Sequence, residues 1–113
     1  MFKKIITLFL VLTSISSTTL AQTPIANINS LPAANNGTIT ICQGQTISFA
    51  SSSTGTASGA TYTWNFGNGL PNAASNPGPH AVVYNTASAG QSVSLTVVNP
   101  NGQQSVAVLN VIV

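Results

Sequence analysis

The feature that most constrains the fold is the alternation in "TYTWNFGNG", residues 61–69. Tyr62, Trp64 and Phe66 fall on one side of an extended chain, and the residues between them are polar. A period of two with aromatic residues on one face is typical of a β-strand that packs against a core. We therefore predict a strand whose tryptophan is a central core residue, followed by a tight turn at Asn68-Gly69, a pair suited to positive φ.

The same alternation recurs along the chain, and no stretch shows the period of a helix. In the last segment Ala107, Leu109, Val111 and Val113 share one face. The segment 70–79 holds three prolines and predicts a loop. We expect further strands at residues 25–28, 38–42, 46–51, 80–84, 91–99 and 104–113. The pattern predicts an all-β chain, an immunoglobulin-like antiparallel β-sandwich of about seven strands.

Residues 1–21 have the layout of a secretory signal peptide. Lys3 and Lys4 precede an apolar run from Ile5 to Leu12, and a Ser/Thr stretch then ends at the small residue Ala21. The apolar run is shorter than the ~20 residues that a membrane-spanning helix needs. We predict cleavage after Ala21 and export, with no membrane span.

Residues 22–113 contain no Asp, Glu, Lys or Arg. Nucleic-acid binding is disfavoured, because it depends on cationic side chains that neutralise phosphates. Attachment to anionic membranes is disfavoured for the same reason. A hydrophobic content of 43% in the full sequence nevertheless provides material for a core. A near-zero net charge also removes a common protection against self-association.

The domain organisation predicted from these patterns has three parts. Residues 1–21 are the signal peptide, residues 22–36 a leader or linker with one short edge strand, and residues 37–113 the β-sandwich domain. We expect the chain to be the N-terminal part of a larger protein.

Catalysis has few candidate residues in this sequence. General acid–base chemistry uses carboxylates, histidine or lysine at short range. His80 and Cys42 are the only conventional candidates in residues 22–113. A thiolate pair between them would have no orienting acid, and a single strand histidine is more often structural. We therefore expect no enzyme activity.

Several motifs resemble the PKD (polycystic kidney disease) domain of bacterial secreted proteins, including those of the Bacteroidetes. The family typically shows Trp-Asp-Phe-Gly-Asp-Gly, a proline-containing loop, a strand with His and Tyr, and a later Asn-Gly turn. Here asparagines stand in both aspartate positions, at Asn65 and Asn68. The resemblance covers roughly residues 37–113. The residues that carry it are Trp64, Phe66, Gly67, Asn68, Gly69, His80, Tyr84, Asn101 and Gly102.

The departures from the family pattern bear on metal and disulfide sites. Either Asn or Asp can serve turn geometry, but a chain without carboxylate side chains is a poor calcium ligand. We expect no metal and no cofactor. The resemblance implies a disulfide partner for Cys42 after the Asn-Gly turn, where this chain has Gln103 and Gln104. Cys42 is then either a small buried hydrophobe or an intermolecular disulfide.

The resemblance implies a non-catalytic module of a secreted or cell-surface protein, acting as a spacer or as an adhesion or interaction unit. Its partners would be other domains of a larger secreted protein, a cell-surface protein or a glycan. One alternative is a self-associating extracellular structural subunit, because "SVAVLNVIV" is β-prone and carries no charge or proline. A further alternative is a carbohydrate-binding module that uses Asn, Gln and Thr side chains and an exposed Tyr84.

Overall fold

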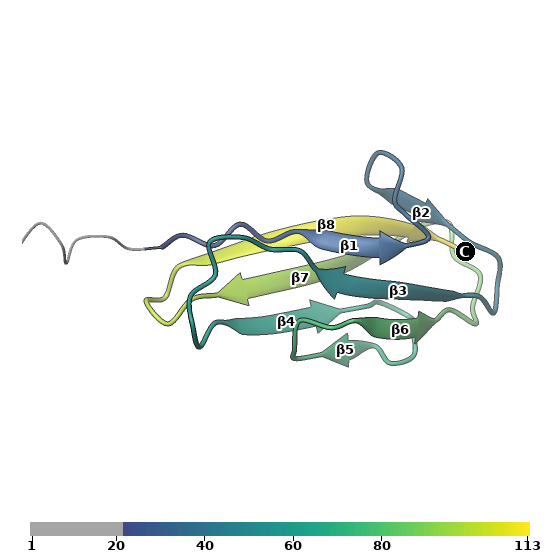
Figure 1. Cartoon of the computed structure of the whole chain (residues 1–113). Coiled ribbons are helices and arrows are strands. Elements are labelled where there is room, and N and C mark those ends of the chain that lie inside the picture. Colours follow the sequence, from purple (N-terminus) through teal and green to yellow (C-terminus); the bar gives the residue numbers. More distant parts are fainter. Residues whose placement is uncertain (1–21) are drawn as a thin grey trace, which may run out of the picture.

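The computed structural model describes residues 22–113, so the predicted signal peptide lies outside the described residues. This part of the chain contains eight strands and no helix, shown in Figure 1. The strands are β1 (Ile28–Leu31), β2 (Thr38–Thr40), β3 (Thr46–Ser51), β4 (Thr61–Asn65), β5 (Ala73–Ala74), β6 (His80–Val83), β7 (Gln91–Val98) and β8 (Gln104–Ile112).

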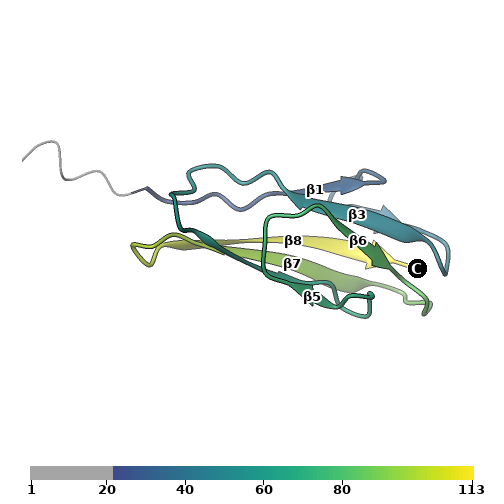
Figure 2. The same ribbon diagram turned by 60° about the horizontal axis from the view of Figure 1, so that its bottom comes forward.

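The strands form two sheets, one ordered β1-β3-β6 and the other β2-β8-β7-β4-β5. Figure 2 shows the layers, with β1 and β3 above β8, β7 and β5. The prediction of an immunoglobulin-like β-sandwich is confirmed. One detail differs, because β2 pairs with β8 in parallel. The chain keeps its direction as it crosses from β1 in one sheet to β2 in the other, so β2 runs alongside β8 instead of against it (Figure 1).

Residues 22–36, expected to be a leader or linker, lie against both sheets. The strand in this segment begins at Ile28, three residues later than expected, and pairs with β3. Ile25 makes only an isolated bridge, donating its N–H to the carbonyl of Thr54 at 2.8 Å. Pro24 is fully buried, and Ala26 donates its N–H to Ser105 Oγ at 3.0 Å.

The segment 70–79, expected to be a loop throughout, contains the two-residue strand β5. Ala74 pairs with Trp64 and Ala73 with Asn65 at the edge of the larger sheet. Pro71 and Pro77 flank the two alanines, and proline cannot donate to a strand ladder. The prolines therefore limit β5 to two residues without preventing it.

The core lies between the two sheets and follows the predicted alternation. Val93, Leu95 and Val97 of β7 have no exposed surface. The rings of Trp64 and Phe66 lie 5.4 Å apart between centroids, within the range of favourable aromatic packing. The buried hydrophobic residues are Ile39, Ile41, Ile47, Phe49, Trp64, Phe66, Val82, Tyr84, Val93, Leu95, Val97 and Val111.

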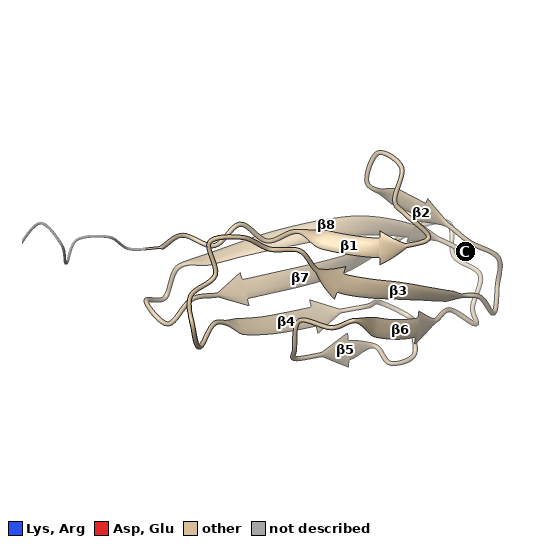
Figure 3. Ribbon diagram, viewed as in Figure 1, with Lys and Arg blue, Asp and Glu red and all other residues tan. Residues whose placement is uncertain are grey.

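The two sheets and all of these core residues lie within residues 22–113, so the described segment has a hydrophobic core of its own. Figure 3 shows its ribbon in one colour, because no described residue is Lys, Arg, Asp or Glu. Within the same segment, no helix long and apolar enough to cross a membrane occurs.

Candidate functional site

The motif turn that follows β4 is held by two amide side chains. Asn65 Oδ1 accepts the N–H of Gly67 at 3.0 Å, which is the bond of an Asx turn. The N–H of Asn68 is donated to Gln91 Oε1, at the start of β7, at 2.7 Å. Asn65 therefore does what an aspartate would do in this turn, whereas Asn68 contributes its backbone N–H.

The residue of this turn with positive φ is Gly67, at 66°, and not Asn68 or Gly69 as the sequence led us to expect. The Asx turn at Asn65 brings the bend one residue earlier. Gly69 is needed for space instead. A Cβ atom at Gly69 would lie 2.3 Å from Val82 Cγ1 and 3.0 Å from the ring of Tyr84.

Tyr84 closes the core beneath the turn. Its hydroxyl donates to the carbonyl of Phe66 at 2.8 Å, and the side chain has no exposed surface. Burial raises the pKa of Tyr84 to about 12. The expectation that Tyr84 is exposed, which formed part of the carbohydrate-binding alternative, is therefore wrong. Tyr84 lies two residues after the inward-pointing Val82, so its side chain also points inward. The Tyr84 ring occupies the space beside Gly69.

His80 packs against the central tryptophan at the edge of the smaller sheet. The two ring centroids lie 5.7 Å apart in an edge-to-face arrangement. Trp64 Nε1 donates to the carbonyl of Asn76 at 2.8 Å, and His80 Nε2 lies 3.0 Å from the same oxygen. Because that carbonyl can only accept, Nε2 carries a proton in this geometry. His80 thus fixes the loop before β6.

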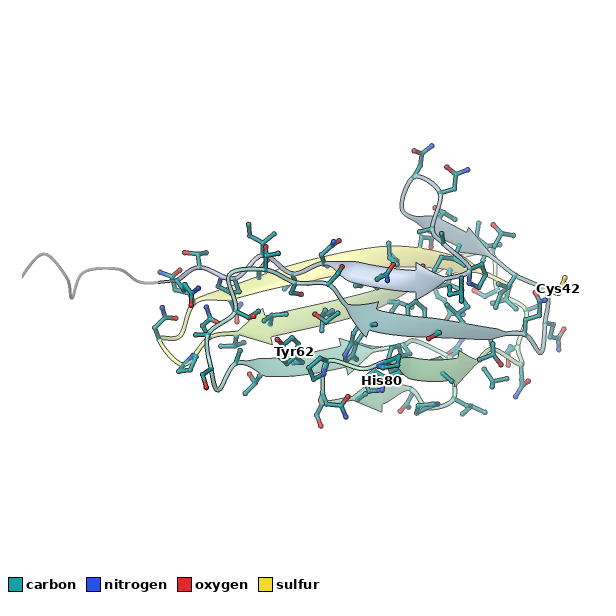
Figure 4. The ribbon with its side chains drawn as sticks, in the orientation of Figure 1. Cys42, Tyr62 and His80 are labelled. Atoms are coloured by element: carbon teal, nitrogen blue, oxygen red, sulfur yellow. The ribbon has the colours of Figure 1, made fainter. Side chains whose placement is uncertain are left out.

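Cys42 lies at the end of the sandwich, far from His80 and from Tyr62 (Figure 4). The two candidate catalytic residues are not brought together. The cysteine is exposed, so its interpretation as a small buried hydrophobe is wrong. It follows the last inward residue of its segment, Ile41, at the point where the chain turns away from β2. An intermolecular disulfide stays a prediction for Cys42.

The predicted Asn-Gly turn joins β7 to β8. Asn101 Oδ1 accepts the N–H of Gln103 at 3.0 Å, and the N–H of Gly102 is donated to the carbonyl of Asn99 at 2.9 Å. Gly102 has φ 90°, as expected for such a turn. This turn stands at the end of the sandwich opposite the Asn68 turn, because β7 runs the length of the sheet between them (Figure 1).

Sequence reasoning missed Asn99, which is only 2% exposed. Its Oδ1 accepts the N–H of Ala57 at 3.0 Å, and its Nδ2 donates to the carbonyls of Gly55 and Gln22 at 3.0 and 3.1 Å. One amide thus joins three segments. The signal was available, because Asn99 continues the inward alternation of β7 and a polar residue at such a position needs partners.

The described residues hold no cluster of three or more His, Cys, Asp or Glu side chains. Among the described residues the polar groups of both turns are hydrogen-bonded or exposed, except Gln91 Nε2, which is buried without a hydrogen-bond partner. The polar side chains of the two turns therefore stabilise loops. Together with His80 and Cys42, they provide no paired acid and base among the described residues.

An all-β sandwich with a buried strand tryptophan and these turns defines an immunoglobulin-like module. A comparison with protein families matches residues 31–113 to the PKD domain, and the chain belongs to that family. A search of curated proteins finds no match. PKD domains occur in extracellular and cell-surface proteins and are generally non-catalytic, so membership indicates an extracellular interaction module.

Proposed function

We propose that this chain is exported and acts as a non-catalytic spacer or adhesion unit of a secreted or cell-surface protein. Its partners are other domains of a larger secreted protein, of which this domain is the N-terminal part, or a protein of the cell surface. The observation that carries the proposal is the PKD family match over residues 31–113.

Two features of the domain support this role. The side chains that could take part in acid–base chemistry are far apart, with His80 bound to a loop carbonyl and Cys42 at the end of the sandwich. The large rings of Trp64, Phe66 and Tyr84 are used in the core. Such a domain presents amides, hydroxyls and backbone to its surroundings, which suits contact with other proteins more than a reaction.

Export is tested by expressing the full chain with a C-terminal tag in a bacterium and measuring the mass of the recovered protein. We expect a mature protein that begins at Gln22 and is digested when protease is added to intact cells or periplasm. The matched control is Leu10→Arg, which breaks the apolar run of the signal segment. Uncut protein retained in the cytoplasm would contradict the proposal.

The choice between spacer and adhesion unit is tested by domain exchange. Residues 22–113 are replaced, in the complete secreted protein, by an unrelated β-sandwich of equal length. A spacer depends on length and stiffness, so the exchange preserves the activity of the attached domains and their display. An adhesion unit depends on its own surface, so cell attachment is lost although display is kept. If the exchange changes neither display nor attachment and the domain can also be deleted, both roles are rejected.

Self-association is the second candidate, and one observation favours it. Val106 and Val108 on β8 are 53% and 57% exposed, beside a strand edge that is only partly covered. The carbohydrate-binding alternative is not supported by Tyr84, because this ring is buried and not exposed.

A further inference from the structure

Within residues 22–113, one edge of strand β8 is paired with another strand only at its C-terminal end. On one side β8 pairs with β7 along its whole length. On the other side β2 reaches only Asn110, Val111 and Ile112. In Figure 1 β2 accordingly flanks only the part of β8 nearest the C-terminus. Residues 104–109 therefore have no strand paired to them on this side, although Ala26 of the segment before β1 donates its N–H to Ser105 Oγ. We call this stretch the β8 edge.

The residues that direct backbone groups toward this edge follow from the pairing with β2. Asn110 donates its N–H to the carbonyl of Gly37 at 2.8 Å, and the carbonyl of Ile112 accepts the N–H of Ile41 at 2.9 Å. Alternate residues of a strand direct both groups to the same side. Gln104, Val106 and Val108 thus turn their N–H and C=O groups to the β8 edge.

Within residues 22–113, none of these three residues has a backbone hydrogen-bond partner on that side. Three donors and three acceptors are left for water or for another strand. Such a row is a template for strand addition.

The other sheet edges are protected. β2 has three residues, and on its outer side Thr38 and Asn35 exchange backbone hydrogen bonds of 2.9 and 3.0 Å. β1 has four residues and is followed by Pro32, and β5 has only two residues. β6 is preceded by Pro79 and is bridged at its last residue, where Leu70 and Val83 exchange backbone hydrogen bonds of 2.9 and 3.0 Å. Where β4 extends past β5, Tyr62 is the β4 residue whose backbone N–H and C=O face the uncovered side. Short strands and prolines are common protections of sheet edges, and the β8 edge has neither.

The side chains along the β8 edge also suit a second copy of this chain. Val106 and Val108 project from the outer face of the sheet and are more than half exposed. In a contact across a two-fold axis, the residue on the axis lies opposite its own copy, so a charge at that residue would face a like charge. The described domain has no charged side chain, which removes this repulsion.

We propose that β8 pairs antiparallel with β8 of a second copy of this chain, across a two-fold axis at Val106. Pairing Gln104 with Val108 of the partner subunit, and Val106 with Val106 of the partner subunit, uses all three free residues. A register shifted toward the C-terminus is blocked, because Asn110 is already bonded to Gly37. The two five-stranded sheets then join into one sheet, and valine side chains meet on its outer face.

This inference deepens the self-association candidate of the proposed function. The test uses purified Gln22–Val113. A domain that does not dimerise would reject this proposal but not export or the spacer role. A failure of export or of the spacer role would leave dimerisation untouched. The measurement is light scattering after size exclusion, with and without reductant, from about 10 µM to about 1 mM, the range suited to a small interface. We expect a dimer that accumulates with concentration and is insensitive to reductant.

The decisive variant is Val106→Lys, which places two ammonium groups opposite each other at the axis and should weaken the dimer about tenfold or more. The matched control is Thr63→Lys, which adds the same charge on an exposed position of the same sheet, two strands away. It should leave the dimer unchanged. Val106→Pro removes a free N–H and should also weaken the dimer, without breaking a hydrogen bond inside the monomer.

Amide hydrogen exchange on the unmodified domain provides a readout that does not depend on variants folding. The amides of Val106 and Val108 should exchange fast in dilute solution and become protected as the dimer forms. A domain that stays monomeric at about 1 mM overturns the proposal. A dimer that dissociates in reductant also overturns it, because such a dimer is held by a Cys42 disulfide. A dimer that forms without protecting the amides of Val106 and Val108 overturns it as well.

Discussion

At the scale of single residues, the motif turn depends on one close contact. Gly69 lies against Val82 and the ring of Tyr84, and the hydroxyl of Tyr84 is bonded to the carbonyl of Phe66. The turn and the strand β6 therefore meet without space for a side chain at residue 69. The glycine is required there for packing and not for its backbone angle.

Gly69→Ala is expected to lower the free energy of unfolding by about 1–3 kcal/mol, because its Cβ would overlap buried atoms of Val82 and Tyr84. Urea unfolding of Gln22–Val113 measures the change. In the background of Val82→Ala the same substitution should cost less, because the nearest atom is gone. Equal costs in both backgrounds would show that this contact does not limit residue 69.

Tyr84 gives the domain an alkaline pH dependence. Burial raises the pKa of Tyr84 to about 12, above the value of ~10 for an unfolded tyrosine. The folded state holds the proton more tightly, so this stabilising contribution is complete below pH ~10 and is lost as the pH rises toward the folded value. Unfolding free energy measured from pH 8 to 12 should fall over that range.

Tyr84→Phe should flatten this fall and should cost about 1 kcal/mol at neutral pH, because a buried hydrogen bond is lost. The cost stays modest because the carbonyl of Phe66 also accepts the N–H of Gly69 at 3.2 Å. Tyr62→Phe is the control, since Tyr62 is partly exposed. An alkaline fall that persists unchanged in Tyr84→Phe would assign it to another group.

At the scale of elements, Asn99 connects parts of the chain that are distant in sequence. It stands between β7 and β8 and bonds both to the loop between β3 and β4 and to Gln22. Its bond to Gln22 is one of several contacts that hold the segment before β1, together with the Ile25–Thr54 bridge and the bond from Ala26 to Ser105.

Asn99→Ala is expected to destabilise the domain by about 2–3 kcal/mol, because two carbonyls and one N–H lose a buried partner. Asn101→Ala is the matched control. It also bonds to the carbonyl of Gln22, but it is exposed and water can replace it, so we expect a loss below about 1 kcal/mol. Denaturant unfolding compares the two, and equal losses would reject the role of Asn99.

At the scale of the whole molecule, the described domain is stabilised without side-chain charge. Acid unfolding of proteins is mostly the protonation of carboxylates that are paired or hydrogen-bonded in the native state. Here the two sheets are joined by apolar packing, and amide side chains hold the turns.

We therefore expect the unfolding free energy of Gln22–Val113 to change by less than about 0.5 kcal/mol between pH 5 and pH 2. The control variant Asn65→Asp restores a carboxylate that would accept the N–H of Gly67, which lowers its pKa. The carboxylate's contribution to the unfolding free energy is present above its unfolded pKa and is lost as the pH falls through its folded pKa. Urea midpoints at several pH values test both, and a steep acid loss in the unmodified domain would contradict the expectation.

The amino-acid sequence by itself determined the class of fold and most of the core. Alternation is a local property, so the strands, the inward rings of Trp64 and Phe66 and the inward face of β7 follow from the order of residues alone. The family resemblance was readable for the same reason, because its motif marks a strand, a turn and their spacing.

Only the tertiary structure decided which of these local features meet. The burial of Tyr84, the partners of Asn99, the exposure of Cys42 and the open edge of β8 all depend on contacts between segments far apart in the chain. A strand pattern states which side chains point inward, but it does not state which strand lies beside which or where a neighbour ends. That pairing is set by how the two sheets pack and cross over, and it determines which strand edges the domain leaves unpaired.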